Sequence, residues 1–158
     1  MSDPIRVRAL RAHDVPALRD MLALFGREFD DVPTYTARQP DDAWLARLLA
    51  GDTFIAVAAW AADGSIVGGL AGYAQVRAAA RRVLHLRPGH RRGASARGIA
   101  TALIGELKRV VAARGVYVVF VQADAGDDAA IALYSKLGVR EDVHHFDIGL
   151  TGDDKERS

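Results

Sequence analysis

The sequence contains no cysteine, and this absence removes several kinds of chemistry at once. Without a thiol the chain has no disulfide scaffold, no thiolate nucleophile and no cysteine-ligated metal. It also has no apolar run long enough to span a bilayer, and its first ten residues lack the apolar core of a signal peptide. We therefore expect a cytoplasmic protein that does not contact membranes.

Acidic residues are missing from one stretch, Arg77–Arg97, which holds seven arginines. The rest of the chain carries fourteen basic residues against twenty acidic ones, so the net charge of +1 conceals an acidic surface with one basic insertion. Basic segments bind nucleic acid, but this one has no aromatic side chain to stack on bases. A non-catalytic nucleic-acid-binding module through Arg77–Arg97 is therefore our third hypothesis, and we do not expect nucleic acid as a partner.

The 158 residues, half of them hydrophobic, suffice for one domain with a sizeable core. We expect this domain at residues 1–150, followed by a frayed polar tail at 151–158. Apolar runs and alternation predict strands at Ile5–Leu10, Thr53–Ala61, Ser65–Val76, Arg82–Arg87, Tyr117–Gln122 and Val143–Ile148. Helical spacing and caps predict helices from Asp14 to about Phe25, at Ala43–Ala50, at Ala96–Gly115 and at Ala129–Leu137.

The connections follow from turn residues. Asp63-Gly64 predicts a hairpin and Pro88-Gly89 a turn, with loops at Gly26–Pro40 and Gly89–Ala96. The glycines in Ser65–Val76 indicate a bulge or a close backbone approach. The order of elements predicts an α/β (α+β) fold with a mixed, mostly antiparallel sheet and helices on both faces.

The helix at Ala96–Gly115 opens on small residues. Such an opening exposes backbone N–H groups at the positive end of the helix dipole, which is a site for phosphate. The alternative is plain close packing of the helix on the sheet.

This order, with a phosphate-type loop entering the helix after the fourth strand, resembles the GCN5-related N-acetyltransferases (GNAT). Leu24–Pro40 (LFGREFDDVPTYTARQP) and Tyr117–Lys136 (YVVFVQADAGDDAAIALYSK) are similar to the class I aminoglycoside 3-N-acetyltransferases, the gentamicin acetyltransferases. The resemblance implies an acyl-CoA N-acyltransferase fold, a homodimer and no metal. It implies transfer of acetyl from acetyl-CoA to the 3-amino group of an aminoglycoside antibiotic, by direct attack of the amine on the thioester. Our second hypothesis is an N-acetyltransferase for another polyamine or amino-group substrate.

The resemblance also assigns roles to residues. Tyr134 matches a tyrosine that protonates the leaving thiolate; the alternative is that it packs with its hydroxyl outward. The cofactor pyrophosphate lies on the backbone amides of the loop, here Arg97, Gly98, Ile99, Ala100, Thr101 and Ala102.

Carboxylates would bind and steer a cationic small-molecule substrate. The alternative is that they are solvated loop charges and helix caps, and Asp127 or Asp128 is expected to cap a helix in either case. His144 and His145 are adjacent in an expected strand, so they point to opposite faces and do not chelate one metal together. The candidate substrate-binding residues are Glu28, Asp30 and Asp31 in one loop and Asp124, Asp127 and Asp128 in another, with Asp147 a weaker candidate.

One segment departs from the family. Members carry a strand of the type YIYDLAV followed by HRR, and its aspartate is the expected base or substrate anchor. Here RVLHLRPGHRRGASAR (82–97) replaces it, and Ser95 stands where the loop usually begins with Arg or Gln. Codons can be chosen for Val83–Arg97 that read SYIYDLAIAEAHRR one nucleotide later, so our hypothesis is a pair of compensating frameshifts near Arg77 and Arg97. Without the aspartate we expect weak or absent acetyl transfer by this chain.

Overall fold

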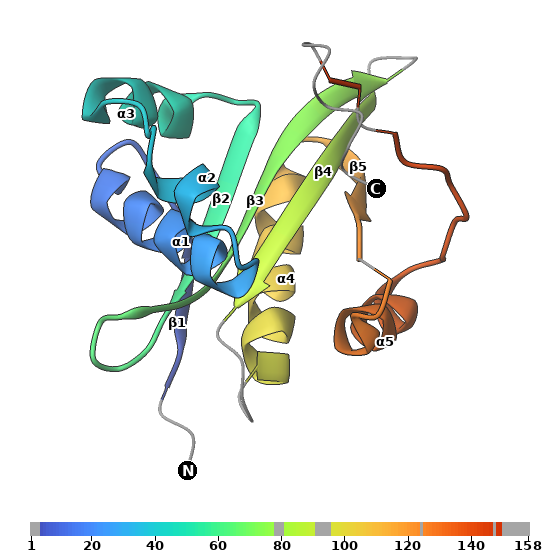
Figure 1. Ribbon diagram of the computed structural model, residues 1–158. Coiled ribbons are helices and arrows are strands. Elements are labelled where there is room, and N and C mark those ends of the chain that lie inside the picture. Colours follow the sequence, from blue (N-terminus) through green and yellow to red (C-terminus); the bar gives the residue numbers. More distant parts are fainter. Residues whose placement is uncertain (1–3, 78–80, 91–95, 124, 147, 150–158) are drawn as a thin grey trace. The chain divides into compact units, whose positions relative to one another are not determined.

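The computed structural model describes residues 4–77, 81–90, 96–123, 125–146 and 148–149 (Figure 1). The chain divides into two compact units, residues 1–122 and 123–158, and each is described by itself. The first unit contains β1 (Arg6–Ala9), α1 (Val15–Glu28), α2 (Val32–Thr36), α3 (Asp42–Ala50), β2 (Phe54–Trp60), β3 (Ile66–Arg77), β4 (Arg81–His90), α4 (Ala96–Ala113) and β5 (Val116–Val121). The second contains α5 (Asp128–Leu137).

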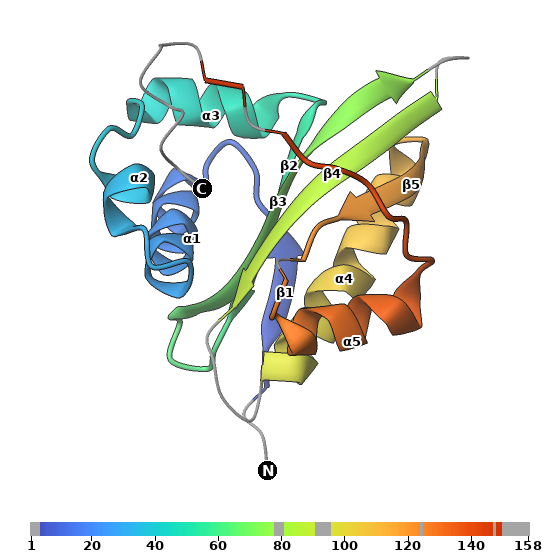
Figure 2. The ribbon, with the colours of Figure 1, turned by 45° about the vertical axis from the view of Figure 1, so that its right-hand side comes forward.

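The five strands form one sheet in the order β1-β2-β3-β4-β5, seen obliquely in Figure 2. β1 to β4 pair antiparallel, whereas β5 runs parallel to β4. A parallel pair needs a crossover connection, and α4 supplies it. The predicted mixed, mostly antiparallel sheet is confirmed, and so is the parallel strand predicted from the apolar run after Gly115.

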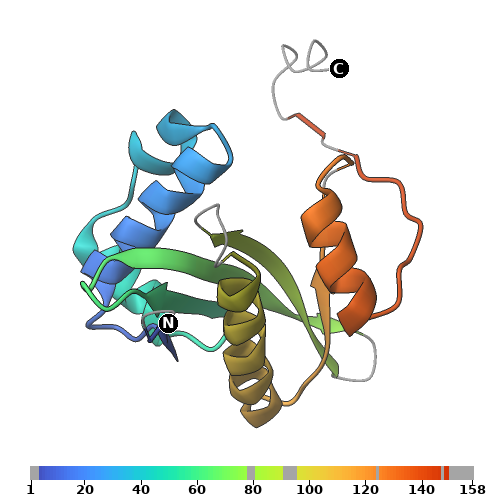
Figure 3. The ribbon, with the colours of Figure 1, turned by 90° about the horizontal axis from the view of Figure 1, so that it is seen from below.

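Helices cover both faces of the sheet, as the sequence predicts, and β2 shows why. All seven of its residues are buried. Phe54 and alternate residues pack with α1 and α3 in one core cluster, whereas Ile55 and the residues alternate to it pack with α4 in a second cluster. Successive side chains of a strand point to opposite faces, so one continuous apolar strand serves two cores. Figure 3 shows the blue helix α1 and the gold helix α4 on opposite sides of the sheet.

Both features predicted from the glycines of β3, a bulge and a close backbone approach, occur in the structure. The register shifts between Ala59 and Trp60 where β2 meets the start of β3, which is a bulge-type irregularity. Gly69 lies against α1, and a Cβ built on it would overlap the sulfur of Met21, which is fully buried. The close approach of α1 to the sheet therefore requires glycine at this position.

Two predicted connections are wrong. Gly26–Pro40 is not wholly a loop, because α1 continues to Glu28 and α2 follows at Val32–Thr36. Tyr35 of α2 packs on Phe25 and Phe29, with ring centroids 6.2 and 5.9 Å apart. This tertiary contact cannot be predicted from local sequence patterns.

Pro88-Gly89 is not a turn either. β4 continues through both residues to His90, with Leu70 paired to Pro88 and Gly69 to Gly89. β5 does not pair with this part of β4, so within the described sheet the proline lies on an open edge, where a strand tolerates a missing N–H.

Val143–Ile148 is not a strand in its described residues, 143–146 and 148. Val143 and Phe146 are strongly exposed, and no ladder pairs them with another strand. An apolar alternation predicts a strand only where a neighbouring strand takes up its hydrogen bonds, and the sequence does not say whether one does. The expected tail, 151–158, lies outside the described residues.

Candidate functional site

The N-terminus of α4 is the predicted phosphate site. The helix begins at Ala96, as the sequence predicts, so Arg97–Ala102 form its first two turns and not the loop that the family resemblance implies. The N-cap and the first three residues of a helix have N–H groups with no acceptor within it, whereas the N–H of the fourth residue donates to the N-cap carbonyl. Because α4 begins at Ala96, the described N–H groups of this kind belong to Ala96, Arg97 and Gly98. Of the predicted segment, Arg97 and Gly98 therefore offer N–H groups for a phosphate.

The side chains of this turn divide between sheet and solvent. Ile99 and Ala100 are buried, and Ile99 belongs to the core cluster beneath α4. Gly98, Thr101 and Ala102 are exposed. A Cβ on Gly98 would meet no described atom within 4 Å, so packing on the sheet does not require glycine there. Close packing therefore accounts for Ile99 and Ala100, and it leaves Gly98 as an unobstructed approach to the helix backbone.

β4, the strand that precedes this helix in the chain, is paired by β5 along only part of its edge. β5 pairs with β4 from Arg82 to Leu86 and stops at Val121. β4 runs on to His90, still paired with β3 on its other side. Its last four residues, 87–90, therefore have a strand partner on one side only within the described sheet, and exposed strand edges bind extended ligands through backbone hydrogen bonds.

Tyr134 lies in α5, in the second unit, and is half-buried. Burial, with a smaller effect of the Asp127 charge, raises the pKa of Tyr134 to about 12. The phenol therefore stays protonated at physiological pH and is a proton donor only.

Three predicted acidic residues lie together at the junction of α1 and α2. Glu28 is the last residue of α1, and the exposed Asp30 and Asp31 lead into α2. Asp30 has a φ of 54°, a left-handed conformation that aspartate tolerates better than most residues.

The second acidic loop is partly explained by capping. The Asp127 carboxylate accepts a hydrogen bond from the Ala130 N–H at 3.1 Å, so the expected helix cap is confirmed. Asp128 is exposed in the first turn of α5. Asp124 and Asp147 lie outside the described residues.

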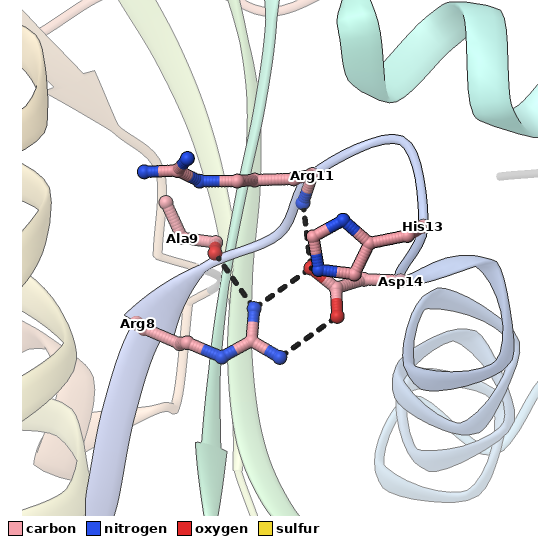
Figure 4. Close-up of polar contacts among 5 residues, drawn as sticks. All are labelled: Arg8, Ala9, Arg11, His13 and Asp14. Atoms are coloured by element: carbon pink, nitrogen blue, oxygen red, sulfur yellow. Dashed lines mark hydrogen bonds and ion pairs between the residues drawn. The ribbon is translucent and has the colours of Figure 1, made fainter.

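Asp14 carries the most strongly shifted described carboxylate, and Figure 4 shows its surroundings. Arg8 donates two hydrogen bonds of 2.7 Å to its two oxygens, and the Arg11 N–H donates a third at 2.8 Å. The Arg8 hydrogen bond is the main cause that lowers the pKa of Asp14 to about 2. Asp14 stands at the predicted N-cap of α1, but its side chain makes no capping bond. It instead ties β1 to the start of α1, which is a structural role.

The described residues hold no group of three or more His, Asp or Glu side chains that could bind a metal ion. His144 and His145 are both exposed, and His144 packs beside Phe146 with ring centroids 6.2 Å apart. None of the described helices is both long and apolar enough to cross a membrane.

A groove of about 430 Å³ lies on the face of the sheet on which α1 and α3 pack, here called the α1–α3 face, and it was not predicted from the sequence. Five of the eleven aromatic residues line it, together with leucines and Pro40. The residues come from α1, α2, α3, β2 and β3, so no local pattern reveals them as one surface. Their concentration between residues 25 and 73 is the only signal that the sequence offers.

Known proteins were compared with the chain. The acetyltransferase (GNAT) family matches residues 16–139. An aminoglycoside acetyltransferase from an uncultured soil metagenomic sample is 46% identical in sequence, with 94% of this chain and 99% of that one covered and a TM-score of 0.88. A second aminoglycoside acetyltransferase from such a sample, solved with sisomicin, is 25% identical over 93% of this chain and 97% of that one, with a TM-score of 0.80.

A more distant structure shares the fold. It is an aminoglycoside acetyltransferase, AAC(6')-Iy, in complex with CoA, 18% identical over 94% of this chain and 96% of that one, with a TM-score of 0.69. No curated protein matches the chain.

Proposed function

Because the chain belongs to the acetyltransferase (GNAT) family, we propose that it transfers acetyl from acetyl-CoA to the 3-amino group of an aminoglycoside. Family membership makes it an acetyltransferase; the donor and the position of transfer are the proposal. The observation that carries the proposal is the aminoglycoside acetyltransferase that is 46% identical over nearly the whole chain.

The start of α4 supports acetyl-CoA as the donor. The N–H groups of Ala96, Arg97 and Gly98 stand at the positive end of the helix dipole, which suits a diphosphate. The open edge of β4 suits the amide groups of a pantetheine arm, because both can pair through backbone-type hydrogen bonds. No described residue obstructs Gly98.

Acetyl-CoA supplies an activated thioester, whose carbonyl carbon the amine attacks while the C–S bond breaks. We assign to Tyr134 the proton that the leaving thiolate takes up; its phenol is neutral at physiological pH, and the raised pKa makes it a weaker acid than an ordinary tyrosine. The attacking amine must lose a proton as well. The base for that step has no assigned residue, because the family's aspartate is missing from the sequence at 82–97.

Carboxylates support a polycationic acceptor. Glu28, Asp30 and Asp31 gather at one junction, and charge-assisted hydrogen bonds from ammonium groups are about twice as strong as neutral ones. Asp124, Asp127 and Asp128 are assigned to the same task, although Asp127 also caps α5.

A panel of acceptors tests the proposal. The purified chain is mixed with acetyl-CoA and either sisomicin, neamine, spermidine or a lysine peptide, and thiol release is followed. Faster release with the aminoglycosides supports the proposal. Release with spermidine alone would favour the wider polyamine class and contradict the aminoglycoside assignment.

A further inference from the structure

The groove on the α1–α3 face has an unusual lining for an open surface. Leucines of α1 and α3 line it together with Ala71 and Gly72 of β3. No charged side chain is among the described residues that line it. Its volume, about 430 Å³, lies within the range of small-molecule sites, which bury one ring or a few.

Two aromatic side chains in this lining are open to solvent. Trp44 is 45% exposed and Tyr73 52% exposed, and Tyr73 packs on Phe54 with ring centroids 5.1 Å apart. A single exposed aromatic needs no explanation. Two in one concave site offer π-faces to a ligand, and such faces attract cations as well as apolar ring surfaces.

The other tryptophan of the chain shows the same preference inside the fold. Arg6 and Arg8 hold their guanidinium groups 5.1 and 4.8 Å from the Trp60 ring. Trp44 has no such cation among the described residues, so its face is available to a cation from outside.

Charge around the groove favours a cation over an anion. The segment 30–42, which contributes Tyr35 and Pro40 to the lining, contains four aspartates and one arginine. The nearby Arg19 pairs with Asp42 at 2.6 Å and donates to the Pro40 carbonyl at 2.9 Å, which cancels one of these negative charges and leaves the segment with a net negative charge. Arg19 thereby also fixes the loop before α3, which carries Trp44.

The groove lies close to the open edge of β4. Tyr73 pairs with His85 of β4, and β4 loses its β5 partner after Leu86. Neighbouring strands are about 4.8 Å apart and residues along a strand about 3.3 Å, so the backbone of Arg87, where the open edge begins, lies roughly 8 Å from that of Tyr73. A ligand of two rings in the groove therefore reaches the edge where the thioester is proposed to lie.

We propose that this groove binds one ring of a cationic amino sugar, with the ring face and an ammonium group on Trp44 and Tyr73. The inference deepens the proposed function and rests on it. Aromatic faces would then share acceptor binding with the carboxylates predicted from the sequence.

Sisomicin binding without acetyl-CoA tests the inference. In a Trp60→Phe variant Trp44 is the only indole, and we expect sisomicin to change its fluorescence in a saturable way. We expect Trp44→Ala and Tyr73→Ala each to raise the sisomicin Kd, measured by calorimetry, about tenfold or more. Trp44→Phe should restore most of the affinity. The matched control is Tyr117→Ala, a tyrosine 54% exposed at the start of β5 and outside the groove, which should not change the Kd.

The outcomes separate this inference from the proposed function. An unchanged sisomicin Kd in folded Trp44→Ala and Tyr73→Ala, with acetyl transfer intact, overturns the groove and leaves the function. Binding that depends on Trp44, with no acetyl transfer even in a variant that carries SYIYDLAIAEAHRR at residues 83–96, supports the groove and contradicts the function. A Trp44 response to an uncharged alkyl glycol and none to sisomicin, or no sisomicin binding at all, also overturns the inference.

Discussion

Asp14 shows that a strongly shifted carboxylate need not be catalytic. It is 7% exposed, and both of its oxygens are occupied by Arg8 and the Arg11 N–H. Perturbed pKa values gather at active sites and at structural ion pairs alike. Because both carboxylate oxygens of Asp14 already accept hydrogen bonds from the protein, we assign this residue a structural role.

Asp14→Asn should therefore cost stability in a pH-dependent way. The pKa of Asp14 falls from 3.8 to about 2 on folding, so its ion pair stabilises the fold above about pH 4 and is lost as the pH falls to 2. We expect a loss of about 2 kcal/mol at pH 7, measured by urea denaturation. The exposed Asp20→Asn should cost under about 0.5 kcal/mol. Equal losses at pH 7 in both variants would contradict the account.

Gly69→Ala should destabilise the protein by about 1–3 kcal/mol, because its methyl group would overlap the buried Met21 side chain. Shortening that side chain in the double variant Met21→Ala, Gly69→Ala should give a measurable positive coupling in thermal denaturation. Additive losses would show that the two residues do not meet.

Tyr134→Phe should lower kcat about 100-fold and leave the KM for acetyl-CoA unchanged, because it removes a proton donor but little packing volume. An unchanged kcat would remove Tyr134 from the mechanism.

Asp127→Asn separates the two roles of that aspartate. Asparagine caps a helix as well as aspartate does, so α5 should remain folded. The negative charge that helps to raise the Tyr134 pKa is lost, so the phenol should ionise below pH 12, but still above 10 since burial is the larger cause. Ultraviolet titration against Tyr134→Phe measures this. An unshifted ionisation would show that the charge does not act on Tyr134.

At the scale of secondary-structure elements, the N-terminus of α4 is where we propose that the diphosphate of acetyl-CoA binds. Gly98→Glu should stabilise the helix by up to about 1 kcal/mol, because glycine is a poor helix former and an acid suits the first turns. The same carboxylate would repel a diphosphate, so we expect CoA to bind about tenfold more weakly.

Gly105→Glu is the matched control for that change. Gly105 is an exposed glycine of α4 with no described atom within 4 Å of a built Cβ, and it lies two turns further along the helix. It should gain similar stability and keep its CoA affinity. An equal loss of affinity in both variants would move the diphosphate away from the α4 N-terminus.

The elements also show how far sequence reasoning reaches. The buried strand β2 and the hydrophobic face of α4 can be predicted from local apolar spacing. For this reason the sequence could predict a sheet with helices on both faces. α2 depends on Tyr35 packing against Phe25, and the length of β4 depends on its ladder with β3. The groove depends on five elements meeting. α2, the length of β4 and the groove all depend on contacts between segments that are distant in the sequence. No single local residue pattern predicts such contacts.

At the scale of the whole molecule, we expect the segment 82–97 to determine how active the chain is. We expect the chain as written to transfer acetyl weakly, because its sequence lacks the family's aspartate. A variant with SYIYDLAIAEAHRR in place of residues 83–96 should be at least about 100-fold faster, a gain typical of restoring one catalytic group. Equal rates in the two proteins would show that the segment does not limit activity. The nucleotide sequence of this region and the intact protein mass test the frameshift hypothesis directly.

The most direct test of the central claim is the NMR structure of the product that the segment-restored variant forms from sisomicin and acetyl-CoA. We predict one acetyl group, attached to the 3-amino nitrogen of the 2-deoxystreptamine ring. Acetyl on another amine would keep the enzyme class and contradict the assigned position. An unmodified sisomicin, with the protein folded and able to bind CoA, would contradict the claim that this acetyltransferase acts on aminoglycosides.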